Sequence, residues 1–331
     1  MLFILLKLCY YKFSQIIGII QFFCNNFKNR YLRSLDCSKM SKKVLITGCN
    51  GQLGRDLQES AQGYPDLQPL YTDIDTLDLT QGSNVQDYIN KQRPDFIVNC
   101  AAYTAVDKAE DEEELAILLN AKAVGNLATA AQQVSAIFIH ISTDYVFDGK
   151  KTTPYLETDL VNPQSAYGRS KLMGEKAALA YKRSMVIRTS WLYTAAGNNF
   201  VNTMLRLGAE RSELNVVSDQ RGTPTYAADL ANAIWSIISK IDKGEKPFTA
   251  GIYHYSNEGE CSWFEFAQRI MALGQRSCAV HPINSSQYPT KAARPAYSVL
   301  SKEKIKTTYG LRIPAWDEAL ARCFQKINIK T

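Results

Sequence analysis

The chemistry that this sequence can perform depends first on a tyrosine and a lysine in the segment YGRSK at 167–171. Tyr167 and Lys171 are four positions apart, and on a helix this spacing puts both side chains on one face. A nearby ammonium favours phenolate and lowers the pKa of the Tyr167 phenol toward neutrality. The pair therefore predicts a general acid for a carbonyl oxygen that receives a hydride. Surface pairs with this spacing are also common, so the interpretation depends on the surrounding motifs.

A threonine follows the strand that we predict over residues 136–141, in the sequence STDY at 142–145. The Thr143 hydroxyl can donate a hydrogen bond to the same carbonyl oxygen. It comes before the Tyr167 segment and after a phosphate loop, and this order supports one reaction site. We predict Tyr167, Lys171 and Thr143 as the catalytic residues.

The phosphate loop is the segment TGCNGQLG at 47–54, between a predicted strand over 44–46 and a predicted helix over 52–61. Its glycines have the spacing Gly-x-x-Gly-x-x-Gly. Glycine allows a tight turn and lets the backbone approach a pyrophosphate, which then sits on the helix N-terminus. The alternative is an ordinary strand–helix turn. The strand before and the helix after favour a dinucleotide site, whose predicted residues are Gly48, Gly51, Gln52, Leu53 and Gly54.

The choice of cofactor depends on Asp73, which ends the second predicted strand nineteen positions after Gly54. A carboxylate there accepts hydrogen bonds from the adenosine ribose and favours NAD over NADP. Arg55 argues the other way, because its guanidinium could pair with a 2′-phosphate. NADH and NADPH therefore both stay open. Asp78, next to Leu79, could contact the adenine or cap the following helix; both residues belong to the predicted cofactor site.

The elements that must position these residues alternate along the chain from residue 42. We predict strands over 44–46, 70–73, 96–98, 136–141 and 185–188, and helices over 52–61, 85–92, 112–133 and 164–181. This alternation is typical of an α/β fold, a doubly wound parallel sheet of Rossmann type. The small residues Ala101 and Ala102, followed by Tyr103, come after the third strand. There they allow a flat cofactor to lie against the backbone at the sheet edge where ligands bind.

After about residue 190 the alternation loosens, with predicted helices over 199–209, 227–239 and 263–273. We predict a dinucleotide-binding domain over 41–190. Residues 191–331 are then mainly a smaller C-terminal lobe that binds the substrate.

Composition limits the partners and the location. The net charge is +6, of which the first forty residues, with six basic side chains and one acidic one, supply +5. The remainder is near neutral, so nothing indicates a nucleic-acid partner. The eight cysteines form no Cys-x-x-Cys pair and the chain has three histidines, which argues against a zinc site. Scattered thiols in a chain of this length indicate reduced cysteines of a cytoplasmic protein.

Residues 1–40 are apolar and aromatic, but Lys7 and Lys12 interrupt the run, and no signal-peptide order is present. Met40 is followed by Ser-Lys-Lys and a strand, which resembles a natural start. We therefore predict an N-terminal extension outside the fold and no membrane partner. The alternative is a membrane anchor with Lys28 and the basic residues after it on the cytoplasmic side.

Several segments, in one order, resemble the extended short-chain dehydrogenase/reductases, and among them the dTDP-4-dehydrorhamnose reductase family. Besides the motifs above, they are NCAAYTAVDKAE at 99–110, STDYVFDG at 142–149, RTSWLY at 188–193, GNNF at 197–200, DQRGTPT at 219–225 and Arg294-Pro295. The resemblance runs from about Ser41 to near the C-terminus. It implies reduction of the C4 ketone of dTDP-4-dehydro-L-rhamnose to dTDP-L-rhamnose by NADH or NADPH, a step of nucleotide-sugar biosynthesis.

The resemblance also implies residue roles. Tyr167 is the implied proton donor, and Lys171 its activator, which also holds the nicotinamide ribose. Asn120 resembles the helix asparagine that helps to position the lysine. The implied substrate contacts are Thr143, Asp144 and Trp191. The implied cofactor contacts include Ala101, Ala102, Tyr103, Tyr167 and Lys171. Trp191 could equally be a core aromatic residue after a strand.

Related sugar-nucleotide dehydratases carry Asp-Glu after the threonine, whereas Tyr145 follows Asp144 here, which favours simple reduction. Some family members are described with Mg²⁺ at a dimer contact. Glu210 matches part of that pattern, but Asp56 stands where a glutamate is expected, so a homodimer and Mg²⁺ both stay open and we predict no metal ligands. The alternatives are a reductase of another nucleotide 4-keto sugar, or a non-catalytic regulatory subunit like that of methionine adenosyltransferase.

Overall fold

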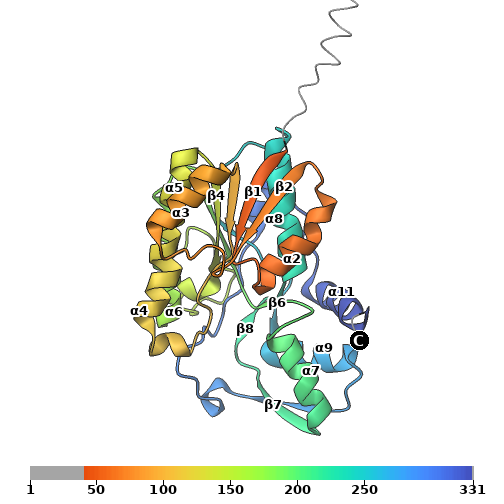
Figure 1. Cartoon of the computed structure of the whole chain (residues 1–331). Helices are drawn as coiled ribbons and strands as arrows, with labels where there is room; N and C mark the ends of the chain where they lie inside the picture. Colours follow the sequence, from red (N-terminus) through yellow and green to blue (C-terminus); the bar gives the residue numbers. More distant parts are fainter. Residues whose placement is uncertain (1–40, 330–331) are drawn as a thin grey trace, which may run out of the picture. The chain divides into compact units, whose positions relative to one another are not determined.

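The computed structural model describes residues 41–329, and its centre is a six-stranded sheet in the order β10-β5-β4-β3-β1-β2 (Figure 1). Every neighbouring pair is parallel. β1 lies between β2 and β3, so the order of the chain reverses there and a crevice forms at the carboxyl ends. The strands are β1 (Lys42–Thr47), β2 (Leu67–Thr72), β3 (Phe96–Asn99), β4 (Ile137–Thr143), β5 (Ser184–Thr189) and β10 (Gly251–His254).

Helices cover both faces of this sheet (Figure 1). On one face, α3 (Gly82–Gln92), α5 (Ala123–Val134) and α6 (Ala166–Leu179) pack against side chains such as Phe138. On the other, α2 (Gln52–Ser60) and α8 (Ala227–Asp242) form a second core with β1 and β3. Burial on two sides explains the continuous apolar runs of the strands. The predicted doubly wound Rossmann-type fold is confirmed.

One strand of the central sheet, β10, comes from a part of the chain in which the sequence pattern predicted no strand. β10 pairs with β5, and α8 packs on α2, where the Trp235 indole donates a hydrogen bond to the Leu57 carbonyl at 3.0 Å. The segment GIYH that forms β10 is too short and too polar to be recognised as a strand from the sequence. Residues 227–254 therefore return to the sheet from the region predicted to be mainly the C-terminal lobe.

The predicted helix over 112–133 is in fact three pieces. α4 (Glu113–Ile117) leads into a π-helical turn at Leu118–Lys122, and α5 follows. Such a turn contains an extra residue and is frequent at functional sites. Here it carries Asn120, which is fully buried.

A third core lies beyond the carboxyl ends of the sheet (Figure 1). It joins α7 (Phe200–Glu210), α9 (Trp263–Leu273) and α11 (Trp316–Ile329) through side chains such as Phe266 and Leu320. A small parallel sheet, β7 (Glu213–Val217) with β12 (Ala279–Ile283), completes it. The remaining strands are β6 (Leu192–Tyr193), β8 (Arg221–Gly222), β9 (Thr225–Tyr226) and β11 (Cys261–Ser262), and the remaining α-helix is α10 (Glu303–Tyr309).

The predicted N-terminal extension lies outside the described residues. Within residues 41–329, no helix combines the length and the apolar character that crossing a membrane requires.

Candidate active site

The phosphate loop turns tightly between β1 and α2 because two of its glycines have no room for a side chain. Gly48 has φ +66°, and a Cβ there would lie 2.6 Å from the Ala101 nitrogen. A Cβ on Gly54 would lie 2.3 Å from the Gly48 carbonyl oxygen. Gly51 is the N-cap of α2 and makes no side-chain cap. The bare start of α2 therefore fits an anionic group such as a pyrophosphate.

A cavity of about 290 Å³ opens beside this loop, at the carboxyl ends of β1, β2 and β3. It brings together most of the predicted cofactor residues, namely Gly48, Gly51, Asp73, Asp78, Leu79, Ala101 and Ala102. The sequence did not indicate Ile74, Leu77, Leu119 and Ala123, which also line the cavity. Ile74 is 73% exposed, and an exposed large apolar residue after a strand is a signal that could have found it. The cavity has apolar side chains on its wall and glycine backbone at its edge, and both features fit a dinucleotide.

Six predicted cofactor residues lie outside the lining of this cavity, and two of them, Tyr167 and Lys171, are described below with Thr143. Leu53 packs in the core, and Gly54 supports the loop from below. The Gln52 side-chain oxygen is buried and has no hydrogen-bond partner among the described residues. Tyr103 is held through its backbone by Asn120.

The two acidic residues of the cavity have local partners. Asp73 accepts hydrogen bonds from the Asn50 nitrogen at 2.8 Å and the Ile74 nitrogen at 2.9 Å, which ties the phosphate loop to the end of β2. Asp78 accepts from the Thr80 nitrogen and hydroxyl, and this lowers the pKa of its carboxyl. Asp78 is not the cap of α3, whose N-cap is Gln81. It forms a turn before the helix while it lines the cavity.

Tyr167 lies beside Thr143 because α6 begins against the segment that follows β4. Ser165 caps α6, accepting a hydrogen bond from the Gly168 nitrogen at 3.1 Å. A Cβ on Gly168 would lie 2.3 Å from the Tyr145 carbonyl oxygen, so only glycine allows this approach. The predicted catalytic residues are thus assembled, with Thr143 and Tyr167 close enough for a hydrogen bond that lowers the pKa of the phenol.

The predicted direction of the overall pKa shift of Tyr167 is wrong for the chain alone. Burial raises the pKa of the phenol well above its ordinary value, and the Thr143 hydrogen bond offsets this only in part. The Lys171 ammonium donates instead to the Ile141 carbonyl oxygen at 2.6 Å. Desolvation of the phenolate is the dominant cause. Tyr167 therefore holds its proton at neutral pH.

Lys171 is almost completely buried, with 2% of its surface exposed. Desolvation lowers its pKa to about 8, although the neighbouring Glu175 carboxylate raises it. Glu175 is in turn fixed by a buried bidentate ion pair with Arg188 of β5, at 2.8 and 2.7 Å, and by the Ser142 hydroxyl of β4 at 2.6 Å. This network anchors α6 to the sheet one turn beyond Lys171.

The buried Asp144 carboxylate has a hydrogen-bond partner on only one of its two oxygens among the described residues. Its Oδ1 accepts from the Thr143 hydroxyl at 3.0 Å, whereas its Oδ2 has no hydrogen-bond partner among the described residues. Desolvation raises the pKa of the carboxyl to about 6, although the neighbouring Ser298 and Thr143 hydroxyls lower it. A buried free carboxylate oxygen next to Thr143 can accept a hydrogen bond from a ligand hydroxyl.

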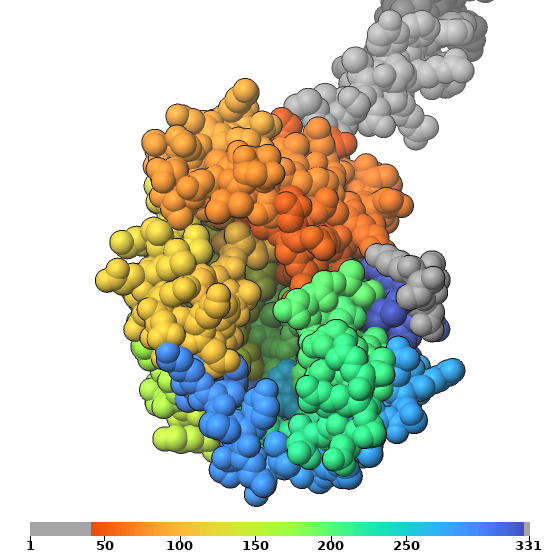
Figure 2. Space-filling view, turned by 60° about the horizontal axis from the view of Figure 1, so that its bottom comes forward, coloured from red at the N-terminus to blue at the C-terminus, as the bar shows by residue number. Residues whose placement is uncertain are grey.

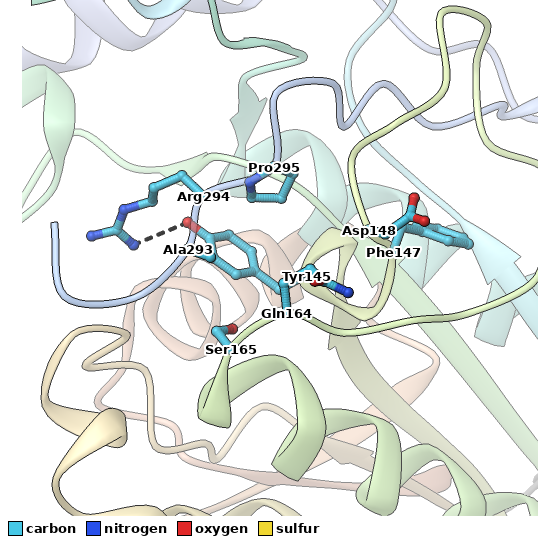
Figure 3. Close-up of a pocket in the computed structure, with 8 residues that line it drawn as sticks. All are labelled: Tyr145, Phe147, Asp148, Gln164, Ser165, Ala293, Arg294 and Pro295. Atoms are coloured by element: carbon cyan, nitrogen blue, oxygen red, sulfur yellow. Dashed lines mark hydrogen bonds between the residues drawn. The ribbon is translucent and has the colours of Figure 1, made fainter. Parts of the chain in front are cut away.

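A smaller cavity, about 140 Å³, lies beside Tyr145 (Figure 3). Its walls come from the segment after β4, the start of α6 and a C-terminal loop, through Tyr145, Phe147, Asp148, Gln164, Ser165, Ala293, Arg294 and Pro295. In the space-filling view, a hollow separates the yellow and orange part of the molecule from the green part (Figure 2).

Comparison with known proteins shows the family to which this chain belongs. The family model described as RmlD substrate binding domain matches residues 42–329. The chain belongs to the RmlD substrate binding domain family. The dTDP-4-dehydrorhamnose reductase of Sinorhizobium fredii is 44% identical over 285 residues, which are 85% of this chain and 96% of that protein.

Two further proteins are similar to this RmlD-family chain. A probable dTDP-4,6-dihydroxy-2-methyloxan-3-one 4-ketoreductase of Streptomyces antibioticus is 40% identical over 287 residues, 86% of this chain and 95% of its own. The crystal structure of dTDP-4-dehydrorhamnose reductase from Bacillus anthracis, in complex with NADP, is 42% identical with a TM-score of 0.82. The match covers 87% of this chain and 100% of that one.

Two residues implied by resemblance have other contacts in this RmlD-family chain. Asn120 donates to the Tyr103 carbonyl and the Ser170 hydroxyl, so it braces α6 through Ser170 rather than through Lys171. Trp191, with φ +47°, stacks flat on Trp263 at 3.5 Å between ring centroids. These contacts match the interpretation of Trp191 as a core aromatic residue whose ring remains partly exposed.

The residues that raised the question of Mg²⁺ do not lie together as a cluster of ligands. Asp56 is buried and is held by Lys326 at 2.9 Å and by the Thr194 hydroxyl at 2.6 Å, whereas Glu210 pairs with Arg206 on the surface. Within the part of the chain that the structure describes, no group of three or more His, Cys, Asp or Glu side chains could hold a metal ion. The charged partner of Asp56 in this structure is the Lys326 ammonium.

Proposed function

We propose that the chain reduces the C4 ketone of dTDP-4-dehydro-L-rhamnose to dTDP-L-rhamnose with NADPH or NADH, in nucleotide-sugar biosynthesis. The observation that carries this function is the joint placement of three features at one edge of the sheet: the phosphate loop, the cavity of about 290 Å³ beside it, and the Thr143–Tyr167–Lys171 group. The relatives supply the substrate class, since those named dTDP-4-dehydrorhamnose reductase are 39% to 44% identical to this chain over the matched residues.

The residues that line the larger cavity would hold the cofactor. Gly48, Gly51 and the start of α2 would bind the pyrophosphate, and Asp73 would accept hydrogen bonds from the adenosine ribose. Ala101 and Ala102 would give the nicotinamide a flat surface. When bound, the reduced nicotinamide supplies the hydride. The related enzyme from Bacillus anthracis is in complex with NADP, and Arg55, just after the phosphate loop, is the residue by which this chain could accept the 2′-phosphate.

The chain's own part in the reduction is to place and protonate the ketone oxygen. When substrate binds, the Thr143 hydroxyl would turn from Asp144 and donate its hydrogen bond to that oxygen. Tyr167 would transfer its phenolic proton to the same oxygen as the C4 alcohol forms. The raised pKa of Tyr167 keeps that proton in place until the oxygen becomes strongly basic. Lys171, one turn further along α6, supplies the positive charge that stabilises the phenolate left behind and holds the nicotinamide ribose.

We propose that the sugar lies between the two parts of the fold. Residues 41–190 bind mainly the cofactor and residues 191–331 mainly the sugar nucleotide, with α8 and β10 as the portion that returns to the sheet. Asp144, through its free Oδ2, accepts a hydrogen bond from a sugar hydroxyl. The exposed edge of Trp191, backed by Trp263, contacts the sugar nucleotide.

We also propose that the enzyme works in the cytoplasm, where the five free cysteines in the described residues stay reduced.

We further propose that the enzyme pairs with a second copy of itself. Leu115 on α4 and Met173 on α6 are 42% and 45% exposed, and these two helices pack against each other. Apolar side chains so placed suit a self-complementary interface. A monomer mass at micromolar concentration in sedimentation would contradict the pairing.

The function is tested by mixing purified protein with dTDP-4-dehydro-L-rhamnose and either NADH or NADPH, and following the absorbance of the reduced cofactor. Turnover is expected, and the ratio of the two rates shows whether Asp73 or Arg55 decides the cofactor. No turnover with either cofactor would overturn the proposed reaction and favour a non-catalytic regulatory role.

The second candidate is reduction of another nucleotide-activated keto sugar. The observation that favours it is the 40% identity with the probable ketoreductase of Streptomyces antibioticus, whose name gives a different sugar. The same assay with dTDP-4,6-dihydroxy-2-methyloxan-3-one separates the two, because the preferred substrate has the higher kcat/KM.

A further inference from the structure

A C-terminal segment reaches across the molecule to the catalytic side. Residues 291–297, here called the strap, form hydrogen bonds at both ends: the Ala292 nitrogen donates to Asp107 Oδ1 at 3.0 Å, and the Tyr297 nitrogen to the Gly149 carbonyl at 3.1 Å. Lys291 adds an ion pair with Asp111. In Figure 2 the blue C-terminal segment lies against the yellow part of the molecule. The strap therefore joins loops that are far apart in the sequence.

Arg294 lies in the middle of the strap and contacts two partners through its guanidinium. Nη2 donates to Asp107 Oδ2 at 2.6 Å, and Nη1 donates to the Tyr145 hydroxyl at 3.1 Å (Figure 3). The guanidinium is a rigid planar fork, so a partner on one prong fixes the direction of the other. Asp107 receives both Arg294 and the strap backbone, and it thereby fixes where Arg294 holds Tyr145.

Tyr145 transmits this position to the catalytic side chain. Its ring meets the Tyr167 ring edge to face, with centroids 5.5 Å apart and an angle of 76°. Its carbonyl oxygen lies against Gly168 at the first turn of α6. Burial raises the pKa of the Tyr145 phenol, so the hydroxyl stays neutral and accepts from Arg294. The ring is thus held between the guanidinium and the proposed proton donor.

We propose that Arg294 is a positioning residue for the reduction: clamped by Asp107, it fixes Tyr145, and the Tyr145 ring holds Tyr167 in place. This inference rests on the proposed function, since it assigns Tyr167 the proton transfer. It gives a role to two motifs of the sequence, the segment around Asp107 and the Arg294-Pro295 pair, that the cofactor cavity does not use.

The test compares steady-state kinetics of Arg294→Met with those of the unaltered enzyme. We expect kcat to fall by about tenfold or more, because small displacements of a catalytic group have large effects on rate. The KM for the sugar nucleotide should change less than kcat, and the Kd for NADPH should stay within about twofold, since Arg294 does not line the cofactor cavity. The matched control is Lys291→Met, which removes a cation from the same strap without reaching Tyr145 and should keep kcat near its normal value.

A double-mutant cycle tests the route through Tyr145. Tyr145→Phe removes the hydroxyl that Arg294 contacts, so it should lower kcat, and Arg294→Met should lower it little further in that background. Additive losses would overturn the route. If Arg294→Met does not fold, Asp107→Asn removes the partner charge at equal size and must show the same loss of kcat.

The inference is overturned if kcat of Arg294→Met stays within twofold of normal, if only KM rises, or if Lys291→Met causes an equal loss. These outcomes differ from failure of the proposed function, in which the unaltered enzyme itself shows no turnover.

Discussion

Replacing Tyr167 with phenylalanine is expected to lower kcat by about 10²–10⁴-fold while the Kd for NADPH changes little. The phenol is the group that can give a proton to the ketone oxygen, and burial keeps it protonated at neutral pH. Phenylalanine retains the ring, and with it the edge-to-face contact with Tyr145, so the loss reports on the hydroxyl alone. Steady-state kinetics and a cofactor titration measure the two quantities.

Tyr181→Phe is the matched control for this substitution. It also removes a buried phenolic hydroxyl, which donates to the Ala136 carbonyl at 2.9 Å, but at the other end of the helix segment and away from Thr143. We expect about normal kcat with a modest loss of stability. A Tyr167→Phe enzyme with nearly normal kcat would refute the role of proton donor, because another group would then have to protonate the oxygen.

Replacing Lys171 with methionine is expected to abolish most turnover, by at least about 10²-fold, and at the same time to stabilise the cofactor-free protein at neutral pH. The pKa of Lys171 is lowered from 10.5 to about 8 mainly by burial. Below pH 8 the folded chain must bury an ammonium, which costs up to roughly 3 kcal/mol. Methionine has a similar length and no charge, so this cost disappears.

The stability difference between Lys171→Met and the unaltered protein should depend on pH. Because the folded-state pKa lies below the unfolded one, the cost is complete below pH 8 and fades as the pH rises toward 10.5. The variant should therefore exceed the unaltered protein in free energy of unfolding at pH 7, and the difference should shrink by pH 10. Urea denaturation at both values measures it.

Lys176→Met, on the exposed side of the same helix, is the control and should change the free energy of unfolding by less than about 0.5 kcal/mol. A Lys171→Met protein that is less stable than normal at pH 7 would show that the hydrogen bond to Ile141 outweighs desolvation. Retained turnover would remove Lys171 from the mechanism.

Local patterns predicted the assembly of the site well. The glycine spacing of the phosphate loop follows from contacts within a few residues, and the Gly54 Cβ position shows why no other residue fits. The same holds for Tyr167 and Lys171, whose relation depends on one helical turn. The alternation of buried runs and helices was enough for five of the six strands of the sheet and for the side on which ligands bind.

Properties that depend on burial or on distant contacts did not follow from the sequence. The pKa of Tyr167 depends on desolvation, which no spacing reveals, and its direction was predicted wrongly. The ion pair of Asp107 with Arg294 joins residues 187 positions apart. The π-helical turn around Asn120 looks like ordinary helix in the sequence, because a single added residue leaves the apolar pattern almost unchanged.

The most direct test of the central claim follows the hydrogen itself. The unaltered enzyme is incubated with dTDP-4-dehydro-L-rhamnose and NADPH, or NADH if that is the better cofactor, deuterated on the transferring face at C4 of the nicotinamide. The product is then analysed by NMR and mass spectrometry. The account predicts dTDP-L-rhamnose with one deuterium, bonded to C4 of the sugar. Product without deuterium, deuterium at another carbon, or no product at all would contradict it.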